Sequence, residues 1–404
     1  MTELQDLSDA ELRQYGFSAR RLRRLDGYLR EAVDSGIVPG VCLGLARADH
    51  PAVFLTHGVR SLERNDRLST DSVYRIASLT KPVVSIAALL LAARGSWRLD
   101  DPVADYFPEI EGMRLLDGEP LQQPMTLLHL LTHTAGFGYD FNVPAGLVGS
   151  YNRVGVAQSL QTTHDFALWL TRLPLLFQPG HGWHYGYSTD LLGYLVELVG
   201  GQPLDVFLRE NIFLPLQMHD TGFSLQGVQR ERYVSLYRYS QDKGFRLLDS
   251  PQSSSVFNSN RVCSGGGGLL SSPADYMKFV RMLNGFGRFQ AQGGEQQLVS
   301  ETAVEAMAAN CLPMQYIPYT IGAGIGYDTE GYGFGYNVRT LVNPRVKSYL
   351  ASEGEFGWAG SNNTYFWVDP HRDLGVVVFT HVVPFAWFPL EQEVKQHVYS
   401  ALVA

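Results

Sequence analysis

Charged residues are scarce in this chain of 404 residues. They make up 18% of it, and the net charge is −8. A mildly acidic chain lacks the basic surface with which proteins bind nucleic acids or anionic membranes. We therefore expect no nucleic-acid partner, and we interpret the net charge as a contribution to solubility.

Long apolar runs are missing as well. The longest, residues 83–93, contains Ser85 and is too short to span a bilayer. The first residues are polar and acidic, unlike the basic start and apolar stretch of a secretory signal. Only Cys42, Cys263 and Cys311 are present, and such a sparse, odd set fits reduced thiols. We expect a cytoplasmic protein without a membrane partner.

Several catalytic and cofactor motifs are also absent. The chain has no Gly-x-Ser-x-Gly elbow and no His-Glu-x-x-His. The glycine run 265–268 is not followed by the Lys-Ser/Thr of a phosphate loop, so we expect it to let the backbone approach another segment. We expect no metal and no cofactor, and structural roles for His133, His181, His184 and His381.

Apolar residues, by contrast, make up 45% of the chain, which is ample for a large core. Their spacing distinguishes strands near both ends of the chain from helices in its middle. Strands are predicted at 41–46, 52–56, 365–368 and 374–380, and terminal helices at 18–34 and 390–402. The region 310–340 is rich in Gly and Tyr and is predicted to be loop or irregular strand.

Strands at both ends with helices between them predict one sheet built from both termini. Because the strands do not alternate with helices in βαβ fashion, the sheet should be antiparallel. The predicted fold class is α/β (α+β): an antiparallel sheet flanked by terminal helices, with a large, mostly helical inserted region. We predict a sheet-containing domain from residues 1–75 and 330–404 and a helical domain from residues 76–329.

Ser78 and Lys81 form a Ser-x-x-Lys motif. On a helix, positions i and i+3 share a face, and a desolvated lysine amine can take the proton of a serine hydroxyl. Pro82 favours a helix that begins close by, which would place Ser78 at its positive end. The motif alone is weak, because residues 240–243 repeat it. That copy is polar and precedes Gly244, so we predict a surface loop there.

The segment around Ser78 resembles the nucleophile segment of the class C β-lactamase superfamily, most closely its family VIII carboxylesterase branch. The matching stretches, in order, are YRIASLTKP (74–82), LTHTAG (131–136), WHY (183–185) with DLLG (190–193), GGGGL (265–269) and FGWAG (356–360). The resemblance runs from about residue 16 to the C-terminus. It implies a β-lactamase/transpeptidase-like fold, with Ser78 as nucleophile and Lys81 as its activating partner.

The resemblance also implies a tyrosine that moves protons near the serine and lysine. It places this residue at Tyr185, five positions before Asp190, the spacing of the esterase branch. Tyr187 is the competitor, because Tyr187-Ser188-Thr189 is closer to the Tyr-x-Asn of the lactamases. We prefer Tyr185, although neither tyrosine supplies the Asn.

Trp358, Ala359 and Gly360 stand where the lactamases carry Lys-Thr-Gly beside the serine. Related esterases often have Trp-Gly-Gly there, so Ala359 is a small departure. By resemblance, the backbone N–H groups of Ser78 and Ser361 would form an oxyanion hole.

An indole offers no charge, so the cation that would hold a β-lactam carboxylate is missing from position 358. Arg75 and Arg261 remain open as substitutes for it. Aromatic residues in or beside the matched segments predict an aromatic pocket; they are Phe137, Tyr139, Phe141 and Trp358.

The sequence therefore predicts a serine hydrolase that cleaves small-molecule carboxylic esters through an acyl-enzyme. An acyltransferase would use the same chemistry with an alcohol or amine in place of water. Trp358 and the apparent lack of export disfavour a β-lactamase or D-amino-acid peptidase. A catalytically silent binding module is the alternative from another class, and the intact Ser78, Lys81 and Tyr185 argue against it.

Overall fold

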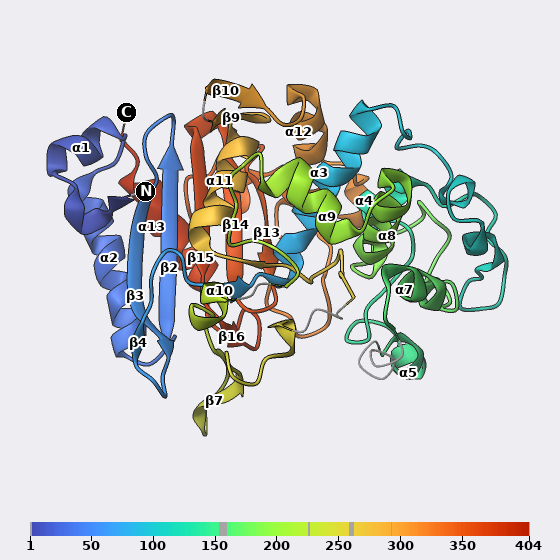
Figure 1. Ribbon diagram of the computed structural model, residues 1–404, viewed down its shortest axis with the longest axis horizontal. Helices are drawn as coiled ribbons and strands as arrows, with labels where there is room; N and C mark the ends of the chain where they lie inside the picture. Colours follow the sequence, from blue (N-terminus) through green and yellow to red (C-terminus); the bar gives the residue numbers. More distant parts are fainter. Residues whose placement is uncertain (1, 153–159, 225–226, 258–261, 292, 404) are drawn as a thin grey trace.

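A large mixed sheet forms the centre of the protein (Figure 1). The computed structural model describes residues 2–152, 160–224, 227–257, 262–291 and 293–403. Within these residues, nine strands form the sheet: β1 (Thr2–Glu3), β2 (Gly40–Arg47), β3 (Val53–Ser61), β4 (Asp66–Arg67), β11 (Tyr332–Phe334), β12 (Arg339–Leu341), β13 (Phe356–Gly360), β14 (Thr364–Asp369) and β15 (Leu374–Phe379). Their order is β1-β3-β2-β15-β14-β13-β12-β11, with β4 beside β3.

The sheet joins the two ends of the chain, as predicted. β15 pairs antiparallel with β2, so strands from the two ends of the chain lie side by side; the register pairs Leu374 with Arg47 and Phe379 with Cys42. All residues of β14 and β15 are buried, because helices cover both faces of the sheet. One expectation was incomplete: β1 pairs parallel with β3, since the short N-terminal segment lies along the outer edge of the sheet.

The two faces of the sheet are covered by different helices. The ring of Phe366 lies 5.5 Å from that of Tyr276 in α11 (Pro273–Asn284), whereas Trp367 lies 4.9 Å from the ammonium of Lys395 in α13 (Leu390–Ala401). Successive side chains of a strand point to opposite faces, so α11 and α13 cover opposite sides. α2 (Ala19–Asp34) packs beside α13 (Figure 1). The predicted terminal helices are therefore confirmed.

A mostly helical region lies beside the sheet (Figure 1). The helices of the region are α3 (Thr80–Ala93), α4 (Leu127–Leu131), α5 (Val148–Tyr151), α7 (Thr163–Leu170), α8 (Ser188–Gly200) and α9 (Leu204–Leu208), and α3, α4, α7 and α9 pack against α8. The short helix α10 (Val228–Glu231) lies apart from this group, at the lower end of the sheet in Figure 1. α11 belongs to the predicted insertion 76–329 by sequence but packs against the sheet. A division of the chain at residue 329 thus separates α11 from the strands that it covers.

Three small sheets complete the strands described. They comprise β5 (Tyr74–Arg75) with β8 (Leu270–Ser271), β6 (Leu236–Ser240) with β7 (Gly244–Asp249) and β16 (Val382–Val383), and β9 (Arg288–Ala291) with β10 (Gly294–Gln297). The remaining α-helices described are α1 (Asp9–Gln14) and α12 (Glu301–Ala308). The second Ser-x-x-Lys copy lies at the exposed turn between β6 and β7, as predicted.

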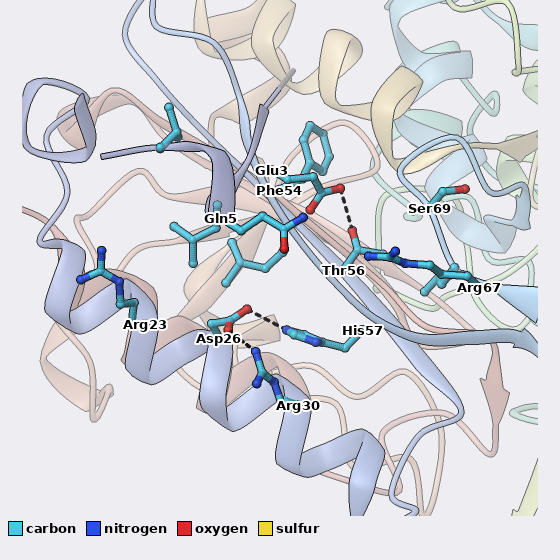
Figure 2. A pocket seen from close by; sticks show the side chains of 14 residues that line it. Glu3, Gln5, Arg23, Asp26, Arg30, Phe54, Thr56, His57, Arg67 and Ser69 are labelled. Carbon is cyan, nitrogen blue, oxygen red and sulfur yellow. Dashed lines mark hydrogen bonds and ion pairs between the residues drawn. The ribbon is translucent and has the colours of Figure 1, made fainter. Parts of the chain in front are cut away.

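A cavity of about 460 Å³ lies at the outer edge of the sheet, between the N-terminal segment, α2 and β3 (Figure 2). Asp26 bonds to His57 at 2.7 Å and to Arg30 at 3.1 Å on one side of it. None of the predicted site residues lines this cavity.

No single helix in the described part of the chain is long and apolar enough to cross a membrane. The segments Ser188–Gly200 and Leu204–Phe213, bent by 81°, meet the criteria of length and composition only as a pair.

Candidate active site

Ser78 lies in a 3₁₀ turn, Ala77–Leu79, that leads directly into α3. Ala77 has a φ of +45°, in the left-handed region that non-glycine residues rarely adopt, so the chain is strained just before Ser78. Thr80 fastens the turn, because its hydroxyl donates to the Ala77 carbonyl at 2.7 Å and accepts from the Leu269 N–H at 3.1 Å. Ser78 is partly exposed at this point.

Lys81 is fully buried one helical turn after Ser78. Its ammonium donates to the Ser78 hydroxyl at 3.3 Å and to the Gly266 carbonyl at 2.6 Å. It also lies 4.6 Å from the ring of Tyr185 and 5.3 Å from the ring of Tyr139. Among the described residues it forms no ion pair, so a buried amine without a carboxylate partner lies beside the partly exposed hydroxyl of Ser78.

The glycine run 265–268 contains Gly266, whose carbonyl accepts the hydrogen bond from Lys81. β5 and β8 pair just upstream of Ser78 and just downstream of the run, and this pairing brings the two segments together. A side chain at Gly266 would collide with the carboxylate of Asp190, and one at Gly265 with the Thr189 carbonyl. The predicted close backbone approach is confirmed, with α8 as the neighbour.

The two candidate tyrosines occupy different environments. Tyr185 lies over Lys81, and its hydroxyl accepts a hydrogen bond from Trp358 Nε1 at 3.3 Å. The Tyr187 hydroxyl instead donates to the Tyr151 carbonyl at 3.2 Å, within an aromatic cluster at the start of α8. Among the contacts that the structure describes, the ring of Tyr185 therefore lies over Lys81, whereas the Tyr187 hydroxyl bonds to Tyr151.

β13 brings the last predicted residues to the site. A side chain at Gly360 would collide with the Ile76 carbonyl, so glycine allows the strand to approach the residues before Ser78. Thr364 donates to the same carbonyl at 3.3 Å. Ser361 follows in the exposed turn, and no described residue accepts a hydrogen bond from its N–H. That N–H is available to a ligand.

Arg75 does not provide a free cation for a substrate carboxylate. Its guanidinium forms an ion pair with Asp249 and donates to the hydroxyls of Tyr233, at 2.9 Å, and Ser254, at 3.1 Å. The other substitute that the sequence left open, Arg261, lies outside the described residues.

The histidines do not form a triad with the serine. Within the described residues, none of His133, His181, His184 and His381 bonds to Ser78. Burial lowers the pKa of His381 to about 4, and burial and the Lys81 charge hold that of His133 well below its usual value. These two rings are therefore neutral at pH 7 and act as fixed hydrogen-bonding groups. The described residues include no cluster of His, Cys, Asp or Glu suited to a metal ion.

The predicted aromatic residues are present, but in unequal positions. Phe137 is fully buried and Phe141 is 53% exposed, whereas Tyr139 and Trp358 contact Tyr185. Trp358 packs between Tyr185, Tyr327 and Phe334.

The sequence reasoning missed Asn142 and Tyr327. Asn142 stands alone in a loop, and Tyr327 lies among many tyrosines of the irregular 310–340 region. Neither position carries a signal that could have distinguished it.

The amino-acid sequence of the chain is similar to those of known proteins. The sequence profile of the Beta-lactamase family matches residues 25–396. The chain is 31% identical over 387 residues to Esterase EstB of Burkholderia gladioli, which covers 89% of this chain and 90% of EstB. It is 34% identical over 288 residues to Acyltransferase mokF of Monascus pilosus, with 66% and 67% covered.

A likeness to solved structures bears on the fold. EstCE1, described as a hydrolase with promiscuous acyltransferase activity, has a TM-score of 0.79 at 22% identity and covers 94% of this chain and 98% of its own. The β-lactamase/transpeptidase-like fold predicted from the sequence is thereby confirmed.

Proposed function

The chain belongs to the Beta-lactamase family, as its motifs predicted, and from this premise we propose that it hydrolyses carboxylic esters through an acyl-enzyme on Ser78. The observation that carries the proposal is the buried Lys81 amine, 3.3 Å from the Ser78 hydroxyl and without a carboxylate partner in the described structure. A lysine in such surroundings can serve as the base that a serine nucleophile requires.

The proposed reaction has two steps. Ser78 Oγ attacks the ester carbonyl, its proton passes to Lys81 and Tyr185, and the alcohol leaves with that proton. The N–H groups of Ser78 and Ser361 hold the oxyanion, a contribution of typically about 3–4 kcal/mol per donor. Water then attacks the acyl-enzyme, Tyr185 and Lys81 take its proton, and the acid leaves as Ser78 is reprotonated.

Esters fit this site better than β-lactams do. A β-lactam carboxylate needs a cation when it is desolvated, and position 358 carries an indole while Arg75 is engaged with Asp249. A charge-assisted partner contributes about 1.5–3 kcal/mol, so its loss lowers kcat/KM by about 10- to 150-fold. A neutral ester carries no carboxylate, so the absence of a cation at position 358 does not lower its kcat/KM.

An acyltransferase is the second candidate, because mokF carries that name and its matched region includes 66% of this chain. In that case an alcohol would replace water in the second step. The two candidates differ in how the acyl-enzyme partitions. Butyrate released from p-nitrophenyl butyrate in the presence of 1-butanol supports hydrolysis, whereas predominant butyl butyrate supports transfer.

Mass spectrometry tests the proposal. After exposure to an alkyl phosphonate ester, the intact protein should gain one adduct, and the labelled peptide should contain Ser78. Ser78→Ala should remain unlabelled and inactive, whereas the control Ser240→Ala should behave like wild type. A label on Ser188 or Ser240 would contradict the assignment. Higher kcat/KM for a chromogenic cephalosporin than for p-nitrophenyl butyrate would favour a lactamase instead.

A further inference from the structure

A single peptide group next to the site is held at both ends by side chains from another loop. Asn142 Nδ2 donates to the Tyr185 carbonyl at 2.8 Å, and the Gly186 N–H donates to His133 Nδ1 at 3.3 Å. These two groups are the C=O and the N–H of the same planar Tyr185–Gly186 peptide. The plane that follows the Tyr185 side chain is therefore fixed from both sides.

We propose that His133 and Asn142 are positioning residues that hold the Tyr185 phenol in register with Lys81 and Ser78. The inference rests on the proposed function, because it concerns the tyrosine that moves protons there. Neither residue contacts Ser78 itself among the described contacts.

His133 is placed for this task by the end of α4. The helix begins with a capping box between Thr126 and His129, and His133 follows its last turn with a φ of +56°. Its ring is fully buried, and its centroid lies 4.8 Å from that of Tyr185. Burial and the Lys81 charge keep the ring neutral, and the contact with the Gly186 N–H implies the tautomer that has its proton on Nε2 and a lone pair on Nδ1.

Asn142 bonds to the backbone of Tyr139 as well as to that of Tyr185. Its Oδ1 accepts from the Tyr139 N–H at 2.8 Å, and Nδ2 donates to the Ile321 carbonyl at 2.8 Å as well as to Tyr185. Tyr139 and Tyr185 are the two rings that lie over Lys81. One amide thus links both rings to the segment around Ile321.

The clamped peptide lies close to a neighbouring backbone segment. A side chain at Gly186 would collide with the Phe137 carbonyl, so glycine brings this peptide directly against the loop that carries Asn142. Loss of either hydrogen bond would let the plane rotate and displace the phenol. Misplacement of a reacting group by about 1 Å can cost about 100-fold in rate.

The test compares substitutions that keep or move single hydrogen-bonding atoms. His133→Asn keeps an acceptor near the Nδ1 position and tolerates a positive φ, whereas His133→Gln carries its polar atoms farther out, near Nε2. Asn142→Asp keeps Oδ1 but loses the donor to the Tyr185 and Ile321 carbonyls. Asn310→Asp is the matched control, because Asn310 also bonds a carbonyl through Nδ2 and backbone N–H groups through Oδ1, outside the site.

We expect His133→Gln and Asn142→Asp to lower kcat on p-nitrophenyl butyrate by about 10- to 100-fold, with KM changed by less than about threefold. His133→Asn should retain most of kcat, and Asn310→Asp should match wild type in kcat. Thermal unfolding of every variant identifies any that fails to fold. Unchanged kcat in both His133→Gln and Asn142→Asp would overturn the inference.

A second readout distinguishes positioning from general structural support. In a Tyr185→Phe background, the further effect of Asn142→Asp on kcat should fall below about threefold, because the group that it positions is gone. A full multiplicative loss there would overturn the inference. Wild-type kcat in Tyr185→Phe itself, with a loss in Tyr187→Phe, would instead refute the tyrosine assignment of the proposed function.

Discussion

Two lysines of this protein are buried to the same degree but have opposite surroundings. Lys81, in the candidate site, is 0% exposed and Lys395, in α13, is 1% exposed. Lys395 forms an ion pair with Glu355, lies 3.5 Å from Glu391 and donates to Tyr332 at 3.1 Å. Lys81 bonds to a hydroxyl and a carbonyl and lies over two aromatic rings, with no carboxylate partner in the described residues.

The difference in partners agrees with the proposal that Lys81, and not Lys395, acts as a base. Burial alone would lower the pKa of Lys395, but Glu355 and the other anionic groups around it raise that pKa above its usual value. Removal of its proton would leave buried carboxylates without a counter-ion. Removal of the proton of Lys81 leaves no such charge behind. Equal burial thus accompanies an ion-paired lysine under the sheet and a lysine without a described carboxylate partner beside Ser78.

The largest expected effect is on activity, at Lys81. Lys81→Met should lower kcat on p-nitrophenyl butyrate by about 10²- to 10⁴-fold, the usual contribution of a general acid–base group. Stability should change little, because no partner charge is left unpaired. Kinetics and thermal unfolding of the same preparation measure both quantities. Activity within tenfold of wild type would remove Lys81 from the mechanism.

Lys395→Met should have the reverse profile. It should lower the free energy of unfolding by about 3–5 kcal/mol, because Glu355 would stay buried without its partner. At low temperature, where the variant is folded, the kcat of Lys395→Met should stay close to that of wild type. Adding Glu355→Gln should restore part of the lost stability in denaturant titrations. A stable but inactive Lys395→Met would erase the contrast between the two lysines.

A third buried basic residue, His381, should make the stability of the protein depend on pH. His381 is fully buried near the Arg75 cation, and its folded-state pKa of about 4 lies below its unfolded value of 6.5. Above pH 6.5 both states are neutral there. As pH falls from 6.5 to 4, the unfolded state binds a proton that the folded state excludes, so stability should fall by up to about 3 kcal/mol.

Denaturant titrations between pH 4 and 7.5 check this slope. His381→Asn should reduce the slope by the His381 contribution and leave that of the buried His133, whose pKa is also lowered, whereas the exposed His371→Asn should leave the slope unchanged. An equal slope in wild type and His381→Asn would show that His381 does not carry the effect.

The sequence predicted what is local and what is strongly patterned. Ser78 and Lys81 are three residues apart, so their contact follows from helix geometry alone, and the apolar strands at both ends predicted the central sheet. The clamp on Tyr185 joins positions 133, 142 and 186 across loops, where no periodicity connects them. Tyr185 and Tyr187 therefore could not be separated by physical argument before the fold was known.

Lys395 shows a second kind of limit. It lies on the buried face of α13, where its charge gives no sign of burial, and Glu355 comes from a distant loop. Ion-pair partners that are so far apart in sequence can be identified only from the folded structure. For the region 310–340 the sequence predicted only loop or irregular strand, because β11 and β12 have three residues each and are too short to show alternation.

The central claim is that Lys81 acts by giving and taking a proton, and not as a fixed charge. Lys81→Arg tests this most directly, because arginine keeps the cation but cannot be deprotonated in proteins. Single-turnover acylation of Ser78 by p-nitrophenyl butyrate, followed by mass spectrometry, should slow by at least about 100-fold in a variant that unfolds at the wild-type temperature. Acylation within about tenfold of wild type in Lys81→Arg would contradict the account.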